Sequence, residues 1–354
     1  MSIKPENLNA LVKKFSDQKV LECGDLMLDF TIEGKAVGLA PEAACVKILT
    51  RASQFKFTSG GAANCAKNFS SLGADTTAWG IVDFENHADS GQPLSFGHIL
   101  IDTLNREKIK WIGEADPDRE TTVKLRVQGA NSHTAMQQIV RVDLEVYDPY
   151  PPKDKKKLTG NFTAYHAGDY NKGAVTPELI KILRSESKKK KVPLVVDPKM
   201  GEARDENYYH ALYHDVTAIT PNDLELKELT GENFEEDDER QIVKIAKDYA
   251  KQLNTDVVVT RGRFGAIVCP ISGESTNIQT LPVENPSVSG VGDTFAATFT
   301  LALAAGGSLV EATHLAVIAS YLTVKKEGTA SKVSQAEVKA EIDRRVKGKL
   351  YPFE

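Results

Sequence analysis

The stretch Ser287-Val288-Ser289-Gly290-Val291-Gly292-Asp293-Thr294-Phe295 decides how this chain is interpreted. It joins two glycines in a polar loop to an alanine-rich helical pattern, and it places a carboxylate at the junction. A helix N-terminus presents unpaired N–H groups and a partial positive charge, which favour an anion. Asp293 there either caps the helix or accepts a proton from a hydroxyl that attacks a bound phosphate.

The composition predicts a soluble, cytoplasmic α/β protein. The chain has 354 residues, of which 41% are hydrophobic, and a net charge of −5, so a nucleic acid partner is not expected. Its four cysteines are far apart and form no CxxC pair, which fits a reducing compartment. Met1 to Val20 has no signal-peptide pattern, and the longest apolar run, Ala296 to Ala305, is too short to span a membrane.

Apolar strand patterns alternate with helical patterns and end in polar or glycine-bearing loops. These strands are predicted at Val20–Cys23, Thr163–His166, Val192–Val196, Val216–Ile219 and Asp256–Val259. In an open parallel sheet such loops meet at the carboxyl edge, where ligands bind. The first loop carries Asp25 and Asp29, which either face a polyhydroxylated ligand or hold that loop by bonding its own backbone N–H groups.

Two β-rich segments, about 30–57 and 121–143, interrupt this alternation. They predict a small extra sheet, either a lid over the active site or an edge hairpin, on a single α/β unit spanning 1–354. Between them, Gly60 and Gly61 precede a helix whose first turn carries Asn64, an arrangement that either binds hydroxyls or forms only a turn. Further on, Asn222 and Glu225 either organise Mg²⁺ beside nucleotide phosphates or simply begin a helix.

Four motifs occur in the order seen in ribokinase-like (PfkB) carbohydrate kinases, and the chain resembles that family over nearly its whole length. They are Gly60-Gly61-Ala62-Ala63-Asn64, Asn222-xx-Glu225, Thr260-Arg261-Gly262 and Gly290-Val291-Gly292-Asp293. The resemblance implies a three-layer αβα sandwich with a mostly parallel central sheet and a small β-sheet lid. It also implies ATP-dependent phosphoryl transfer to a sugar hydroxyl.

Within the family, the chain is most similar to the heptose-7-phosphate kinases of lipopolysaccharide biosynthesis. The supporting strings are Gly24–Asp29, Pro41–Ala43, Gln137–Asp143, Asp169–Gly173 and Asp197–Lys199. The acceptor implied is the anomeric hydroxyl of D-glycero-D-manno-heptose 7-phosphate. The alternatives are another sugar or sugar phosphate of the ribose or fructose type, or a catalytically weak sugar-phosphate-binding regulator.

The resemblance also implies a role for each matching residue. Asp293 is the base, and Gly290, Val291 and Gly292 offer N–H groups to the γ-phosphoryl group. Asn222 and Glu225 organise Mg²⁺, most simply through water, while Thr260 and Gly262 line the nucleotide site. The sugar hydroxyls are assigned to Asp29, Gly60, Gly61, Asn64 and Asp169. A phosphate already on the sugar is assigned to Arg126, Arg141 and Lys172, with charge pairing in the lid as the alternative for the arginines.

The sequence departs from the family pattern at several positions. Ser287 stands where an Asp is usually tied to a monovalent-cation loop, which leaves dependence on K⁺ open. Phe30 replaces a common basic residue, and Ala44 replaces the last proline of a Pro-Glu-Ala-Pro string, so the sugar is also left open. No nucleotidyltransferase sequence follows before Glu354, so adenylylation of the product by another protein is expected. An exposed lid further suggests a homodimer.

Overall fold

The computed structural model describes residues 3–83, 95–131, 135–199, 205–284, 286, 289–326 and 332–350. Ser287 and the question of K⁺ that depends on it lie outside the described residues. Among the residues described, no helix has the length and apolar character needed to cross a membrane.

A nine-stranded sheet forms the centre of the molecule. Its order is β16-β15-β14-β13-β12-β11-β1-β5-β7. Pairing is antiparallel between β14, β15 and β16 and parallel elsewhere. The strands are β1 (Lys19–Gly24), β5 (Asp75–Trp79), β7 (Lys110–Trp111), β11 (Ala164–Gly168), β12 (Leu194–Asp197), β13 (Ala218–Ile219), β14 (Asp256–Thr260), β15 (Ala266–Cys269) and β16 (Thr276–Ile278).

Helices cover both faces of this sheet, because alternate side chains of each strand enter different cores. Val195 packs in one core, whereas Leu194 and Val196 pack in the other. The first core includes α1 (Pro5–Lys13), α2 (Ala62–Ser71), α8 (Val291–Ala304), α9 (Leu309–Val324) and α10 (Gln335–Gly348). The second includes α4 (Pro177–Lys190), α5 (Glu206–Tyr213), α6 (Asp223–Thr230) and α7 (Glu239–Leu253). The predicted three-layer αβα sandwich is therefore confirmed.

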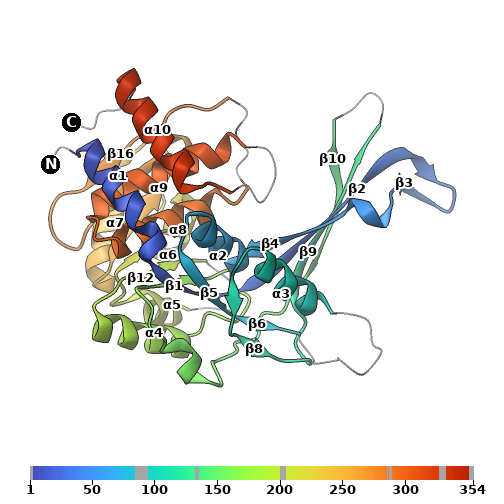
Figure 1. The fold of residues 1–354 in the computed structure, drawn as a ribbon, viewed down its shortest axis with the longest axis horizontal. Helices are drawn as coiled ribbons and strands as arrows, with labels where there is room; N and C mark the ends of the chain where they lie inside the picture. Colours follow the sequence, from blue (N-terminus) through green and yellow to red (C-terminus); the bar gives the residue numbers. More distant parts are fainter. Residues whose placement is uncertain are drawn as a thin grey trace.

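A second sheet, here called the lid sheet, projects from the helical body on the side away from α1 and α10 (Figure 1). It is ordered β10-β9-β2-β3, with β4 also paired to β2. Its strands are β2 (Leu26–Ala40), β3 (Ala43–Leu49), β4 (Phe55–Gly61), β9 (Thr122–Ala130) and β10 (Gln137–Leu144). A third core, which includes residues of α3 (Phe96–Arg106), fills the space between its base and the body. Two short strands, β6 (Ile81–Val82) and β8 (Glu114–Ala115), pair with each other.

The segment after β1 was wrongly predicted to be a loop. Asp29 lies within β2, opposite Thr58 of β4, because Leu26 and Leu28 supply alternating apolar side chains to the third core. Only Asp25 separates β1 from β2. Its carboxylate accepts three backbone N–H bonds from residues 170, 172 and 174, so it holds the loop after β11 and not, as predicted for one of its two uses, the N–H groups of its own loop.

Candidate active site

A cavity of about 340 Å³ lies where the central strands end and the lid sheet begins. Of the residues predicted for the site, it brings together Asp29, Gly60, Gly61, Asn64, Arg126, Asp169, Asn222, Glu225, Thr260, Gly290, Gly292 and Asp293. The other lining residues are Lys124, Tyr170, Asp197, Pro198, Lys199, Thr220, Ser289 and Phe295. The strand-end loops and the lid sheet therefore share one cavity.

Asp293 occupies the first turn of α8 and is buried. Its Oδ2 accepts a hydrogen bond from the Asn64 amide at 2.5 Å, and its Oδ1 accepts one from the Tyr170 hydroxyl. Burial raises the pKa of Asp293 to about 6, while the bonds from Tyr170 and Asn64 act to lower it. The carboxylate is thus mostly ionised at neutral pH yet basic enough to take a proton, as a general base requires.

The N-terminus of α8 has no side-chain cap. Its N-cap is Gly290, in the left-handed region at φ 74°. A Cβ added at Gly292 would meet no atom within 4 Å, so this face of the turn is open. Side chains do cap the N-termini of α3, α4, α5, α6, α7, α9 and α10. The first-turn N–H groups of α8 therefore meet no competing cap and favour an anion.

Acidic side chains gather beside the start of α6. Asn222 and Glu225 form a capping box, each accepting the other's backbone N–H at 2.9 Å, and the second Glu225 oxygen lies 2.9 Å from Lys199 Nζ. Burial and the nearby Glu225 raise the pKa of Asp197 to about 7, although a 2.7 Å bond from Thr220 opposes this. Glu225 therefore does serve as a helix-start acid. The same hard oxygen donors, close to a second carboxylate, also suit Mg²⁺.

The lid sheet contributes charged side chains from neighbouring strands. Arg126 donates to Asp29 at 2.7 Å. Gly60 permits this arrangement, because a Cβ there would meet the Asp29 carboxyl group at 3.0 Å. Lys124 places its ammonium 5.7 Å from the centre of the Tyr170 ring, and the described residues offer it no ion-pair partner. Burial lowers its pKa, which Asp29 partly counteracts. Within the described part of the chain, Lys124 is therefore a cation that lines the cavity without an ion-paired carboxylate.

Four predicted residues do not line the cavity: Val291, Gly262, Arg141 and Lys172. Arg141 forms two 2.7 Å bonds to Asp143 of its own strand. Lys172 lies 3.0 Å from Glu145 and is thereby neutralised. Gly262 begins the turn that follows β14, beyond Thr260. Charge pairing thus accounts for Arg141 and Lys172 without a sugar phosphate.

Sequence reasoning missed several lining residues. Lys124 is two positions from Arg126 on a predicted strand, so the alternation of a strand already placed both on one face. Asp197, Lys199 and Thr220 follow predicted buried strands, which was the signal used for other candidates. Tyr170 carried no comparable signal, since its bond to Asp293 joins residues 123 positions apart.

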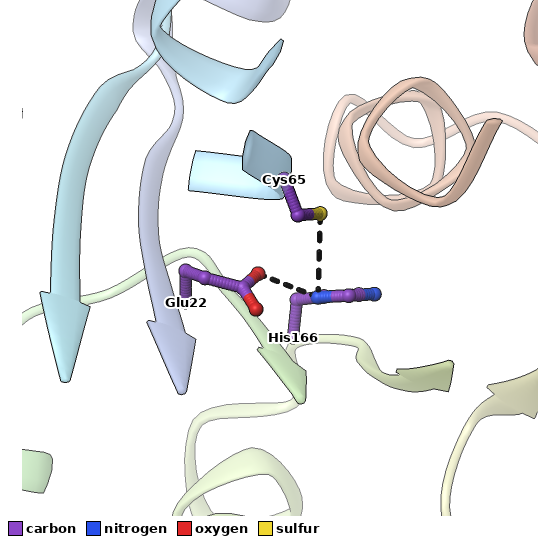
Figure 2. Close-up of side chains that lie close together, drawn as sticks. All are labelled: Glu22, Cys65 and His166. Atoms are coloured by element: carbon purple, nitrogen blue, oxygen red, sulfur yellow. Dashed lines mark hydrogen bonds and ion pairs between the residues drawn. The ribbon is translucent and has the colours of Figure 1, made fainter. Parts of the chain in front are cut away.

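Glu22, Cys65 and His166 form a buried polar cluster (Figure 2) next to the main chain of Asp293. Glu22 and His166 are partners in the register of β1 and β11, and Glu22 Oε2 lies 2.5 Å from His166 Nδ1. Cys65 Sγ lies 3.6 Å from that nitrogen and 3.8 Å from the main-chain oxygen of Asp293. Burial acts to lower the pKa of His166, but Glu22 outweighs it, so the pKa is raised. The 2.5 Å contact leaves no room for a metal ion between the carboxylate and the imidazole.

Comparison with known proteins identifies the family. The profile described as "pfkB family carbohydrate kinase" matches residues 24–336. The "Bifunctional protein HldE" of Bradyrhizobium diazoefficiens is 31% identical over 344 residues, covering 95% of this chain and 65% of that protein. Its namesake in Geobacter metallireducens is 32% identical over 342 residues, covering 94% and 64%. The chain thus spans slightly under two thirds of the length of these relatives.

Solved structures show the same fold. A putative ribokinase from Agrobacterium tumefaciens superposes with a TM-score of 0.70 at 17% identity, covering 93% of this chain and 99% of that one. Phosphofructokinase-2 from Escherichia coli in complex with potassium gives 0.69 at 20% identity, covering 92% and 98%. The chain belongs to the pfkB family of carbohydrate kinases, ATP-using phosphotransferases whose acceptor is an alcohol group.

Proposed function

We propose that this protein phosphorylates a sugar phosphate, with the anomeric hydroxyl of D-glycero-D-manno-heptose 7-phosphate as the acceptor. The observation that carries the reaction is the buried Asp293 carboxylate at the uncapped N-terminus of α8. Support for the heptose comes from the strings shared with heptose-7-phosphate kinases and from the similarity to HldE proteins.

The proposed step is an in-line displacement. The acceptor O–H gives its proton to Asp293, the acceptor oxygen bonds to the γ-phosphorus, and the bond from that phosphorus to the β,γ-bridging oxygen breaks. ADP leaves with the electron pair. N–H groups of Gly290, Val291 and Gly292 stabilise the charge that develops on the phosphoryl oxygens. Asn64 and Tyr170 hold the carboxylate that receives the proton.

Mg²⁺ is proposed at Asn222 and Glu225, most simply through water. It would neutralise charge on the nucleotide phosphates. Lys199 is the cation that offsets Glu225 in the structure described here, and Asp197 adds further negative charge nearby. Thr260 and Gly262 are proposed to line the adjoining nucleotide site. Dependence on K⁺ is decided by measuring the rate in Na⁺ and K⁺ buffers of equal ionic strength.

The phosphate already on the acceptor is proposed to bind Lys124 and Arg126. Lys124 has no ion-pair partner among the described residues. Arg126 is paired with Asp29 but, unlike Arg141 and Lys172, it lines the cavity. Phe30, which stands where the family commonly has a basic residue, is expected to have little influence on which sugar binds. Phe30 stacks on Phe57 with ring centres 4.5 Å apart and is not a lining residue.

An acceptor panel tests the proposal. ADP release is measured with heptose 7-phosphate, ribose, fructose and fructose 6-phosphate at matched concentrations. We expect the highest kcat/KM with heptose 7-phosphate. Turnover with ribose or fructose and none with heptose 7-phosphate would reject the heptose as the acceptor, but the proposed phosphoryl transfer would stand. Tight binding of the heptose phosphate without ADP release from any acceptor would favour a regulator.

A homodimer through the lid sheet is also proposed. The exposed large apolar side chains of this sheet lie mainly on its outer strands. They are Val37, Leu39, Val46, Leu49, Phe55, Ile139, Val140 and Val142. A second copy of the chain would remove this apolar surface from water.

A further inference from the structure

We propose that Tyr170 is a positioning residue for the base: its phenol O–H holds Asp293 oriented and ionised until the acceptor proton arrives. The inference rests on the proposed function, because it concerns the same proton transfer. Tyr170 was not among the residues assigned from the sequence. It touches Asp293 directly through the bond from its hydroxyl to Oδ1.

The loop that carries Tyr170 is fixed. Its backbone N–H donates to Asp25 Oδ2 at 2.8 Å, and the same carboxyl group takes N–H bonds from Lys172 and Ala174 at 3.0 and 2.8 Å. Asn171 follows with φ 56°, a left-handed conformation that turns the chain immediately after the tyrosine. The phenol is therefore presented from a loop that is held by the β1–β2 junction, next to it at the end of the paired strands β1 and β11.

Two different elements hold the two oxygens of the base. Asn64 of α2 donates to Oδ2, and Tyr170 of the loop after β11 donates to Oδ1. An ionised carboxylate accepts both bonds, whereas a protonated one must give up one acceptor site. Burial, followed by the nearby Asp293, raises the pKa of Tyr170 well above its usual value. The phenol therefore stays protonated and remains a donor throughout the pH range in which the kinase is assayed.

Other titratable groups near Asp293 act more weakly. Among the named influences on its pKa, burial is the largest, followed by the bonds from Tyr170 and Asn64, and then by Glu22 and His166. The charged or titratable groups on the surrounding elements include Glu22 of β1, Cys65 and Lys67 of α2, His166 of β11, Asp197 of β12 and Lys124 of β9, whose ammonium lies 5.7 Å from the centre of the Tyr170 ring. All of these remain in place when only the phenol oxygen is removed.

The substitution Tyr170→Phe removes that oxygen and keeps the ring. Because the lost bond favours the ionised form, the acidic midpoint of the kcat–pH profile should move upward, by about one unit. Relative to wild type, kcat then falls about fivefold more at pH 6 than at pH 8. The KM for ATP should stay unchanged, since Tyr170 is not assigned to the nucleotide.

Tyr165→Phe is the matched control. Tyr165 lies on β11, and its hydroxyl accepts a 2.5 Å bond from Lys190 rather than contacting Asp293. The acidic midpoint of the kcat–pH profile of the Tyr165→Phe enzyme should equal that of wild type. A Tyr170→Phe enzyme whose kcat falls by the same factor at every pH, or does not fall, overturns the inference.

The two proposals fail in different ways. If Asp293→Asn transfers phosphoryl groups at the wild-type rate, Asp293 is not the general base and the proposed mechanism is rejected. If Asp293→Asn is inactive while Tyr170→Phe keeps the wild-type midpoint, the mechanism stands and only the role of Tyr170 is rejected. Circular dichroism and ATP binding, measured on each variant, show whether a lost rate reflects a misfolded protein.

Discussion

The central sheet and the lid sheet meet at one cavity but are built differently. Inner strands of the central sheet such as β11 and β12 are buried on both faces, and their ends supply the carboxylates Asp169 and Asp197. In the lid sheet, β3 and β10 are largely exposed, and charges such as Arg141 are neutralised by neighbours on the same strand. On the proposed function, the central sheet would position the reacting groups, while the lid sheet would contact the substrate near the body and a second copy of the chain at its exposed strands.

The largest effect is expected at the base. Asp293→Asn removes the proton acceptor but keeps the size of the side chain, so kcat should fall about 10²–10⁴-fold with ATP binding little changed. Asp143→Asn is the lid-sheet control, because that carboxylate is bound to Arg141 outside the cavity. Steady-state kinetics and calorimetric ATP titration measure both. Equal losses in the two variants would contradict the division between the sheets.

Stability should also divide between the two regions. Phe299→Ala empties a fully buried site on α8 and should lower the free energy of unfolding by about 3–5 kcal/mol. Val142→Ala, at a position 47% exposed on β10, should change it by no more than about 0.5 kcal/mol in the monomer, and by more where the proposed dimer covers it. Urea denaturation of both variants gives the comparison. A large loss for Val142→Ala would mean that the exposed strand is covered in solution.

A smaller effect is expected for Lys124, the lid-sheet cation for which the described residues offer no ion-pair partner. Lys124→Met keeps the length of the side chain and removes its charge, so KM for the sugar phosphate should rise about tenfold or more. The KM for ATP should stay unchanged. Lys56→Met is the control, since Lys56 pairs with Glu33 in an exposed part of the same sheet. If both lysines give the same result, Lys124 has no special contact with the acceptor.

The smallest effect on catalysis is expected at the outer lid surface. The double substitution Leu39→Glu and Val46→Glu places charge on exposed apolar positions and should convert a dimer to a monomer in sedimentation velocity. Lys47→Glu changes charge on the same exposed strand without removing an apolar side chain. A wild-type protein that sediments as a monomer at micromolar concentration would reject the lid dimer.

The fold was largely predictable because its signals are local. A continuous apolar run such as Val195-Val196 predicts a strand of a buried parallel sheet. The alanine-rich pattern after Gly292 predicts a helix that covers it. Asp29 was misplaced because one residue, Asp25, suffices to interrupt the chain between two strands that belong to different sheets. No pattern in a single segment marks such a junction.

Residues that line the cavity were predicted where they belong to one sequence motif, and contacts between distant segments were missed. Gly290 to Asp293 are adjacent in sequence, so their helix-start chemistry can be inferred directly. The partners of the base depend on packing between distant segments: Asn64 and Asp293 are 229 positions apart. Arg141 shows the converse, since a promising residue type was already neutralised by Asp143 two residues away.

The Glu22–His166 pair also bears on how the central strands align. Burying such a pair gives little net stability compared with apolar side chains of similar size. Removing one partner, however, leaves the other as a buried charge without a counter-charge, which is strongly destabilising. A slip of one residue between β1 and β11 would set Glu22 against a neighbour other than His166 and turn one strand's side chains to the opposite face. The pair therefore penalises misalignment of the two strands whose ends, at Gly24 and Gly168, lead into the site.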